Sequence, residues 1–244
     1  MARNSEEKSL NNKIAMVTGG TRGIGYAIVK GLLAEGAKVA FCGVTQSTVD
    51  RAVTNLTPHG RVFGAVCDVS KRDQISRFVT DVVNHFGTID ILINNAGAGT
   101  FRAAADLSPE EWERMISLNL SGVFYCCREV LPILRGKGAG DIVNISSLAA
   151  KNPFAGGAGY NASKFGLNGF SEAMMLDHRS EGVRVCSIMP GSVATEFGGG
   201  SADRGAEWKI APEDVSEAVI AVLRMPARTT ISRVEIRPSR PPSK

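Results

Sequence analysis

Tyr160 and Lys164 are the two side chains whose types and spacing most directly suggest proton chemistry. They stand four positions apart in GYNASKFG, so on a helix they share one face. A free phenol has a pKa of about 10, too high for ready proton exchange at neutral pH, but a nearby ammonium favours the phenolate and lowers that pKa. On this interpretation Tyr160 is an acid or base that the charge of Lys164 tunes.

Ser147 ends the apolar run GDIVNISS, just before the segment that carries Tyr160. A hydroxyl at this place can donate a hydrogen bond to a carbonyl oxygen, or to the alkoxide that this oxygen becomes. The three side chains together predict a site that holds and protonates one carbonyl group. The alternative is that Tyr160 and Lys164 pack against each other on a solvated helix face, as most such pairs do.

A glycine-rich turn, VTGGTRGIG, separates the first apolar run from the first helical pattern. Gly19, Gly23 and Gly25 let the backbone approach a ligand closely, and the helix that follows aims its N-terminal N–H groups at that ligand. The turn therefore predicts a site for the pyrophosphate of a dinucleotide. Its spacing differs from GxGxxG, and in a chain with 27 glycines it could also be an ordinary turn.

The elements that must position these residues are short apolar strands that alternate with amphipathic helices. Strands are predicted at 14–20, 37–43, 62–69, 89–97, 140–147, 183–191 and 229–236. The clearest helices are predicted at 24–36, from 108 to about 135, at 160–181 and after Pro212. Because the strands are apolar on both faces, they predict an α/β fold of the Rossmann-like, doubly wound kind, with one parallel sheet and helices on both faces.

One of these helices has a predicted start. Ser108, Pro109 and Glu111 match a capping box, with Ser108 as the cap, Pro109 at the first helical position and Glu111 reaching back.

Small polar residues follow two of the strands, where an open α/β sheet collects its ligands. Asp68 and Val69 come after the third strand, and Asn94, Asn95, Ala96 and Gly97 come after the fourth. Each of them could also simply cap a turn. Together they outline a groove along one edge of the sheet.

The composition narrows the class of protein. The chain has 244 residues, 43% of them hydrophobic, and a formal net charge of +4, which disfavours nucleic acid as a partner. No run approaches the roughly 18 apolar residues of a membrane span, and the polar N-terminus does not match a secretory signal. Five cysteines, odd in number and within apolar runs, predict reduced core thiols. We therefore expect a cytoplasmic protein that does not bind membranes.

The chain shows no internal repeat and no linker, so one domain is expected. We expect it at 13–237, with a Gly-rich substrate loop at about 192–208. Residues 1–12 are expected to be disordered, and 238–244 to be a flexible basic tail. His59, His85 and His178 lack ligand spacing, so no metal site is expected, and the absence of GxSxG disfavours a serine hydrolase.

From about residue 12 to residue 237 the sequence resembles the short-chain dehydrogenase/reductases. TGGTRGIG (18–25) is similar to the TGxxxGxG cofactor turn of that family, NNAG (94–97) to its fourth-strand motif, and PGSVAT (190–195) to its nicotinamide segment. Tyr160 and Lys164 match YxxxK, Ser147 precedes Tyr160 at the family's spacing, and Asn119 matches the fourth catalytic residue.

The resemblance implies a role for each member of this tetrad. Tyr160 is expected to be the general acid, and Ser147 to orient the substrate carbonyl. Lys164 is expected to bind the nicotinamide ribose and lower the pKa of Tyr160, while Asn119 holds a water in the proton relay. The residues expected to bind the cofactor are Gly19, Thr21, Arg22, Gly23, Ile24, Gly25, Thr45, Asp68, Val69, Asn95, Ala96, Gly97, Tyr160, Lys164, Pro190, Gly191, Val193 and Thr195.

The resemblance also bears on cofactor and substrate. Members that use NAD usually carry an acidic residue where this chain has Gly43, so NADP is favoured over NAD. Many NADP-specific members carry Arg where this chain has Val44, which leaves Arg22 and Thr45 to contact the phosphate. The ending VEIRPSRPPSK differs from that of the acyl-carrier reductases, so the substrate is not named.

We therefore expect an NADP(H)-dependent oxidoreductase that acts on a small carbonyl or secondary alcohol, such as a ketone or a 3-oxoacyl compound. The alternatives are a non-catalytic NADP sensor of the same fold, or a sugar-modifying epimerase or dehydratase. Apolar residues on several faces of the helices at 110–135 and 160–181 predict a homo-oligomer, a tetramer or a dimer. The expected apolar pocket wall comprises Phe101, Phe154, Phe197 and Trp208.

Overall fold

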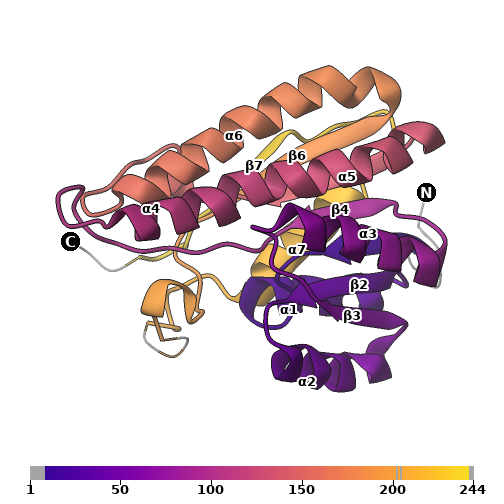
Figure 1. The fold of residues 1–244 in the computed structure, drawn as a ribbon, viewed down its shortest axis with the longest axis horizontal. Coiled ribbons are helices and arrows are strands. Elements are labelled where there is room, and N and C mark those ends of the chain that lie inside the picture. Colours follow the sequence, from indigo (N-terminus) through magenta and orange to yellow (C-terminus); the bar gives the residue numbers. More distant parts are fainter. Residues whose placement is uncertain (1–8, 202, 204, 242–244) are drawn as a thin grey trace.

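The apolar runs of the sequence form the strands of one sheet in the computed structural model, which describes residues 9–201, 203 and 205–241. All pairings between neighbouring strands are parallel, and the strand order is β3-β2-β1-β4-β5-β6-β7 (Figure 1). The strands are β1 (Ile14–Val17), β2 (Lys38–Gly43), β3 (Val62–Val66), β4 (Ile91–Asn94), β5 (Gly140–Ile145), β6 (Val183–Pro190) and β7 (Arg233–Ile236).

Helices cover both faces of this sheet. They are α1 (Gly23–Ala34), α2 (Gln46–Leu56), α3 (Arg72–Phe86), α4 (Pro109–Ile116), α5 (Gly122–Lys137), α6 (Ala158–His178) and α7 (Pro212–Leu223). Helices α1, α2 and α7 share one apolar core with the sheet, and α3, α5 and α6 share the other. The doubly wound architecture predicted from the sequence is therefore confirmed.

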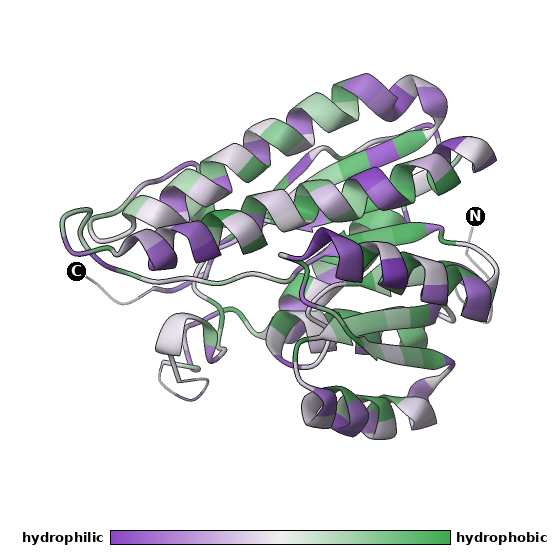
Figure 2. Ribbon diagram, in the orientation of Figure 1, coloured by the Kyte–Doolittle hydropathy of each residue, from purple (hydrophilic) through white to green (hydrophobic). Residues whose placement is uncertain are grey.

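Side chains alternate between the two cores along each strand. In β1, Ala15 and Val17 face the core of α1, whereas Ile14 and Met16 face the core of α3. All four are at most 5% exposed, and Figure 2 shows the strands as largely hydrophobic. Burial on both faces explains why the strands read as continuous apolar runs.

The strand order reverses at β1, which lies between β2 and β4. Chain connections leave β1 in opposite directions on its two sides, so the loops after β1 and β4 diverge and leave a crevice at the carboxyl ends of the strands. The glycine turn follows β1 and NNAG begins at the end of β4, so both motifs lie at this crevice.

The predicted capping box at the start of α4 is confirmed. Ser108 Oγ accepts a hydrogen bond from Glu111 N at 3.2 Å, and a Glu111 carboxylate oxygen accepts one from Ser108 N at 3.1 Å. The helix that was predicted to run unbroken to about residue 135 instead contains a π-helical turn, η2 (Ser117–Ser121), between α4 and α5. That turn carries Asn119.

Several strand boundaries differ from the prediction. β1 ends at Val17 instead of Gly20, since Gly19 has a φ angle of +68° that ends the extended backbone, and β4 is shorter at both ends. β7 begins at Arg233 instead of residue 229, since Thr229 N bonds to Pro226 O and closes a turn there.

The chain ends also differ from the prediction in part. Residues 1–8 and 242–244 lie outside the described residues. The expected disorder of 1–12 is wrong for residues 9–12, because Leu10 is only 4% exposed and its N–H bonds to Glu35 O at 3.1 Å. Within the described part of the chain, no helix combines the length and the apolarity needed to cross a membrane.

Candidate active site

Tyr160 and Lys164 lie on the buried face of α6. Tyr160 is 8% exposed and Lys164 is 5% exposed, which removes them from the solvated face of the alternative interpretation. Lys164 Nζ donates a hydrogen bond to Ile145 O at 2.9 Å and lies 5.9 Å from the centroid of the Tyr160 ring. The bond to Ile145, the last residue of β5, fixes the ammonium beside the phenol at the carboxyl edge of the sheet.

Ser147 lies two residues beyond the end of β5 and begins the short 3-10 helix η3 (Leu148–Ala150). Its hydroxyl oxygen accepts a hydrogen bond from Ala149 N at 3.1 Å, which fixes the side chain. The Ser147 hydroxyl also interacts with the Tyr160 hydroxyl, and this hydrogen bond favours the phenolate. The structure thus brings together Ser147, Tyr160 and Lys164, as the sequence predicts.

Burial controls the proton affinities of the pair. Burial raises the pKa of Tyr160 above its usual 10, and the hydrogen bond from Ser147 opposes this only in part. Burial lowers the pKa of Lys164 from its usual 10.5 to about 8. The direction for Tyr160 is opposite to the one predicted, because desolvation of the phenolate outweighs the favourable contacts. The phenol accordingly stays protonated at neutral pH, the form that can donate a proton.

Asn119 is fully buried in the π-helical turn and ties three segments together. Its side-chain N–H groups donate to Ala98 O at 2.8 Å and to Ser163 Oγ at 2.9 Å, and its oxygen accepts from Ala98 N at 2.8 Å. Ser163 Oγ donates in turn to Tyr160 O at 2.8 Å. Because both amide N–H groups are used, the Asn119 side chain positions α6 directly, a role that the sequence did not reveal.

The glycine turn has the shape expected of a phosphate cradle. Gly19 and Gly23 have φ angles of +68° and +55°, and a Cβ on Gly25 would lie 2.1 Å from Gly19 O. Within the part of the chain that the structure describes, no side chain caps the N-terminus of α1, and the first turn of this helix contains no acidic residue. The free N–H groups and the positive end of the helix therefore fit the pyrophosphate of a dinucleotide.

Thr18 joins the glycine turn to the NNAG segment. Its hydroxyl oxygen accepts hydrogen bonds from Asn95 N and Ala96 N, both at 3.0 Å. Asn95 Nδ2 donates to Thr18 O at 3.0 Å and to Gly19 O at 3.1 Å. These four bonds hold the predicted Asn95 and Ala96 against the turn. The sequence motif TGGTRGIG includes Thr18, but no role was predicted for its side chain.

Gly43 ends β2 beside the glycine turn, where the sequence lacks an acidic residue. A Cβ on Gly43 would lie 2.5 Å from Thr21 Cγ2, so a side chain requires Thr21 to move. Arg22 instead extends from the turn and forms an ion pair of 2.8 Å with Glu196, and both side chains are largely exposed. Thr45 precedes α2 with an exposed side chain that makes no capping bond.

The other predicted cofactor residues border the same edge. Asp68 Oδ1 accepts hydrogen bonds from Ser70 N at 2.9 Å and Ser70 Oγ at 2.8 Å, so this carboxylate also stabilises its own turn. Val69 is buried, and its carbonyl oxygen would lie 2.7 Å from a Cβ on Gly122. Gly97 faces Asn119, whose Oδ1 would lie 2.9 Å from a Cβ there.

The described residues of the segment 192–208, namely 192–201, 203 and 205–208, form a loop that lies against the site, and we refer to it as the lid. Its base is closed by hydrogen bonds from Ala194 N to Ile210 O at 2.9 Å and from Ile210 N to Ser192 O at 3.0 Å. Pro190 ends β6, and Gly191 N bonds to Ile236 O at 2.8 Å. The predicted residues Val193 and Thr195 follow. Thr195 Cγ2 lies 3.4 Å from the Cβ position of Gly23, so the lid contacts the glycine turn.

Three of the four predicted pocket residues gather near Tyr160. The rings of Phe101 and Phe197 lie 5.5 and 5.7 Å from that of Tyr160, and Phe154 lies 5.8 Å from Phe101. Trp208 instead has Lys209 Nζ 5.8 Å from its ring centroid, and no contact with the phenylalanines is observed for it among the described residues.

A chain of buried polar residues connects the sheet to α6, and the sequence analysis missed two of its members, Asn144 and Ser171. Asn94 Nδ2 donates to Asn144 Oδ1 at 2.8 Å, and Asn144 Nδ2 donates to Ser171 Oγ at 2.8 Å. The signal that could have revealed this chain of bonds is Asn144, a single asparagine inside the apolar run of β5.

Comparison with known proteins identifies the class. Residues 13–204 match the short chain dehydrogenase family, so the chain belongs to the short-chain dehydrogenase/reductases and is an NAD(P)-dependent oxidoreductase.

Similar proteins agree with this class over most of their length. The chain is 36% identical over 191 residues to the 3α-hydroxysteroid dehydrogenase of Mediterraneibacter gnavus, covering 77% of this chain and 76% of that protein. It superimposes on an alcohol dehydrogenase from the archaeon Thermococcus sibiricus in complex with 5-hydroxy-NADP, with a TM-score of 0.89, 28% identity and coverage of 96% and 100%. A serine dehydrogenase complexed with NADP+ matches with a TM-score of 0.84, 35% identity and coverage of 91% and 94%.

Proposed function

We propose that this chain interconverts ketones and secondary alcohols with NADP(H) as the hydride carrier, and that Tyr160 is the general acid and base. The observation that carries the proposal is the buried contact of Tyr160 with Ser147, beside the fixed ammonium of Lys164. A sensor that only binds a nucleotide has no use for a buried phenol, hydroxyl and ammonium at one point.

NADPH, when bound, supplies a hydride whose two electrons reduce the carbonyl carbon. Tyr160, protonated at neutral pH, gives its hydroxyl proton to the carbonyl oxygen and then regains a proton from solvent. Ser147 donates a hydrogen bond to the same oxygen and stabilises the negative charge that develops there. In alcohol oxidation the phenolate of Tyr160 accepts the hydroxyl proton.

The ammonium of Lys164 has two functions in this proposal. It would donate to the hydroxyls of the nicotinamide ribose when the cofactor is bound, and its positive charge would stabilise the phenolate of Tyr160 during turnover. Asn119 holds α6 through Ser163 and Ala98, which sets the place of Tyr160. A water of the proton relay would have to bind the Asn119 segment without using the amide N–H groups, since both are occupied.

The glycine turn and the N–H groups of α1 would hold the pyrophosphate, and Arg22 with Thr45 would hold the phosphate that distinguishes NADP from NAD. A guanidinium offers planar donors that suit a phosphate, and Gly43 contributes no repelling carboxylate. NADP complexes among the similar structures, and the hydroxysteroid dehydrogenase among the relatives, support a carbonyl or alcohol substrate with this cofactor.

The decisive experiment follows NADPH absorbance with a panel of ketones, 3-oxo acids and acyl thioesters, using wild-type protein and Tyr160→Phe. The proposal requires turnover by the wild type and its loss in the variant. NADPH binding without turnover of any compound would instead support the sensor.

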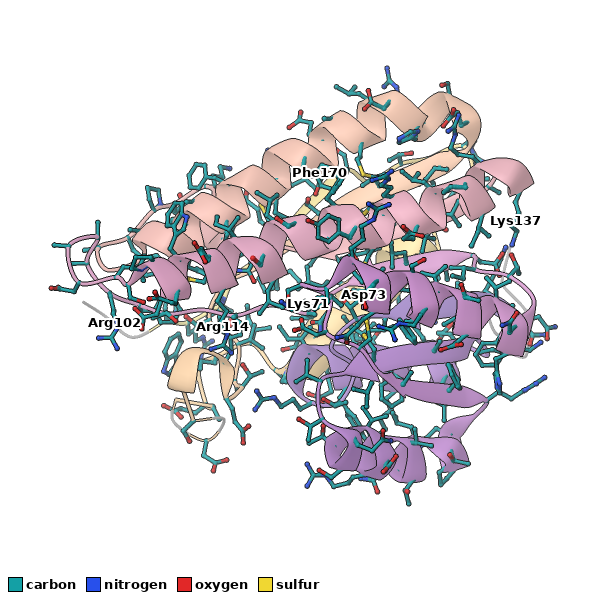
Figure 3. All side chains as sticks on the ribbon, in the orientation of Figure 1. Lys71, Asp73, Arg102, Arg114, Lys137 and Phe170 are labelled. Atoms are coloured by element: carbon teal, nitrogen blue, oxygen red, sulfur yellow. The ribbon has the colours of Figure 1, made fainter. Side chains whose placement is uncertain are left out.

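We also propose a homo-oligomer, preferably a tetramer, located in the cytoplasm. Trp112, Phe124, Phe165 and Leu176 are 42, 43, 44 and 54% exposed on α4, α5 and α6. Phe124 meets Phe170 across α5 and α6 with ring centroids 6.0 Å apart, where Figure 3 labels Phe170. A second copy would cover this apolar surface. Light scattering at micromolar concentration tests the oligomeric state, and a monomer mass would refute the proposal of an oligomer.

The five free, buried cysteines support the proposed location in the cytoplasm, which is a reducing compartment.

A further inference from the structure

Three phenylalanine rings from three separate segments form a cluster with the ring of Tyr160, in which Phe101 and Phe197 contact Tyr160 and Phe154 contacts Phe101. Phe101 comes from the loop after β4, Phe154 from the loop before α6, and Phe197 from the lid. Phe101 meets Tyr160 edge-on at an interplanar angle of 80°, and Phe197 meets it at 56°. Loops that are distant in the sequence thus supply one aromatic surface beside the proton donor.

These rings are exposed although they are apolar. Phe101 and Phe154 are each 46% exposed, and Phe197 is 41% exposed. Glycines make room for them, since a Cβ on Gly99 would lie 2.6 Å from Phe197 and a Cβ on Gly198 would lie 2.6 Å from Phe101. A cluster of rings that is closely packed at its base but open to solvent has the character of a ligand surface.

The charged neighbours of these rings have partners that turn them away from the cluster. Arg102, next to Phe101, pairs with Glu111 at 3.0 Å, and it extends outward at one end of the molecule (Figure 3). Glu196, next to Phe197, pairs with Arg22 of the glycine turn. To pair with Arg102, a carboxylate or phosphate of a substrate would have to displace Glu111, and Glu196 would repel such a group.

We infer that the substrate is a neutral ketone, or the matching alcohol, with a flat apolar ring next to the reacting carbon. This inference rests on the proposed function. A flat ring that enters between Phe197 and Tyr160 replaces their mutual contact with two new ring contacts. A small aliphatic ketone breaks that contact without replacing it, and a charged acyl carrier would have to compete with Glu111 for Arg102, the cation next to Phe101.

The first test compares three probes with NADPH, namely acetophenone, acetone and an acetoacetyl thioester of N-acetylcysteamine. Burial of a phenyl ring should raise kcat/KM for acetophenone over that for acetone by about 30-fold or more. The inference is overturned if kcat/KM for acetone or for the thioester equals or exceeds kcat/KM for acetophenone. That outcome leaves the proposed function intact.

The second test removes single rings. Phe101→Ala and Phe154→Ala should each lower kcat/KM for acetophenone by about tenfold, through a higher KM, and change the value for acetone by less than about twofold. Phe86→Ala is the matched control, since Phe86 meets His85 edge-on at the end of α3 and is not one of the three rings. Equal losses with both ketones would mean that the rings only support the fold.

A binding measurement separates the inference from the catalytic proposal. Calorimetry of Tyr160→Phe with saturating NADP should detect acetophenone binding, and Phe154→Ala in the same background should weaken it by about tenfold. Binding with these properties but no turnover by the wild type would support the ring surface and refute the reductase. Failure of acetophenone to bind, while small ketones are reduced, would refute the ring surface alone.

Discussion

Arg22 Nη1 donates a hydrogen bond of 2.8 Å to a carboxylate oxygen of Glu196, and this ion pair joins the glycine turn to the lid across 174 residues of sequence. The guanidinium expected to contact the NADP phosphate therefore already has an anionic partner. A bound phosphate would compete with Glu196 for Arg22. The side chains are 76% and 66% exposed, so the competing pair is weak.

Arg22→Ala should weaken NADPH binding by about ten- to a hundredfold and leave NADH almost unchanged, because a charge-assisted contact to the phosphate is lost. Glu196→Gln should strengthen NADPH binding by up to about fivefold, since it removes the competitor. Fluorescence titration measures both. Arg228→Ala, at an exposed arginine in the loop before β7, is the control. A wild type that prefers NADH, or an Arg22 variant that loses both cofactors equally, would refute the assignment.

Tyr160→Phe should reduce turnover to less than about a tenth of the wild-type value while NADPH binding stays nearly intact. The ring keeps its contacts with Phe101 and Phe197, but the transferable proton is gone. Steady-state rates and NADPH titration measure the two properties separately. Residual activity above that level on a good substrate contradicts the role of general acid.

Lys164→Met should make the protein more stable at pH 7 by up to about 3 kcal/mol, because the pKa of Lys164 is lowered from 10.5 to about 8 by burial. The folded state binds fewer protons than the unfolded state between these values, so the cost of the buried charge is full below pH 8 and disappears as pH rises towards 10.5. Urea denaturation at pH 7 and pH 9 measures the difference, and the exposed Lys30→Met is the control. If the free energy of unfolding of the Lys164 variant changes with pH as it does in the wild type, the destabilising effect of the buried charge is refuted.

The same lowered pKa predicts a pH limit for catalysis. In the wild type, kcat/KM for NADPH should fall above about pH 8, because Lys164 then becomes neutral and the positive charge beside Tyr160 is lost. Any residual alcohol oxidation by Lys164→Met should have its midpoint shifted to higher pH, because on the proposed mechanism the variant lacks the positive charge that stabilises the phenolate of Tyr160. A variant that keeps the wild-type midpoint argues against this tuning.

Local signals in the sequence predicted local structure well. Ser108, Pro109 and Glu111 interact within one helical turn, so their pattern identified the capping box. Helical spacing alone also predicted that Tyr160 and Lys164 share one face, but not that this face is buried. The alternation of apolar runs was enough to predict the doubly wound sheet.

Contacts between distant segments could not be predicted in this way. Nothing local distinguishes the π-helical turn around Asn119 from an ordinary helix, and its bonds to Ala98 and Ser163 form only in the folded chain. The burial of Leu10 depends on packing against the core of α1. The raised pKa of Tyr160 likewise depends on how completely the fold removes it from water.

The lid contacts both ends of the site through neighbouring residues. Glu196 holds Arg22 of the glycine turn, and Phe197 covers the ring of Tyr160. Adjacent residues on one loop cannot move independently, so whatever draws Arg22 away from Glu196 also changes access to Tyr160. Binding of the two substrates should then follow a compulsory order with NADPH first. In such an ordered mechanism, NADP inhibits competitively with respect to NADPH and non-competitively with respect to the ketone.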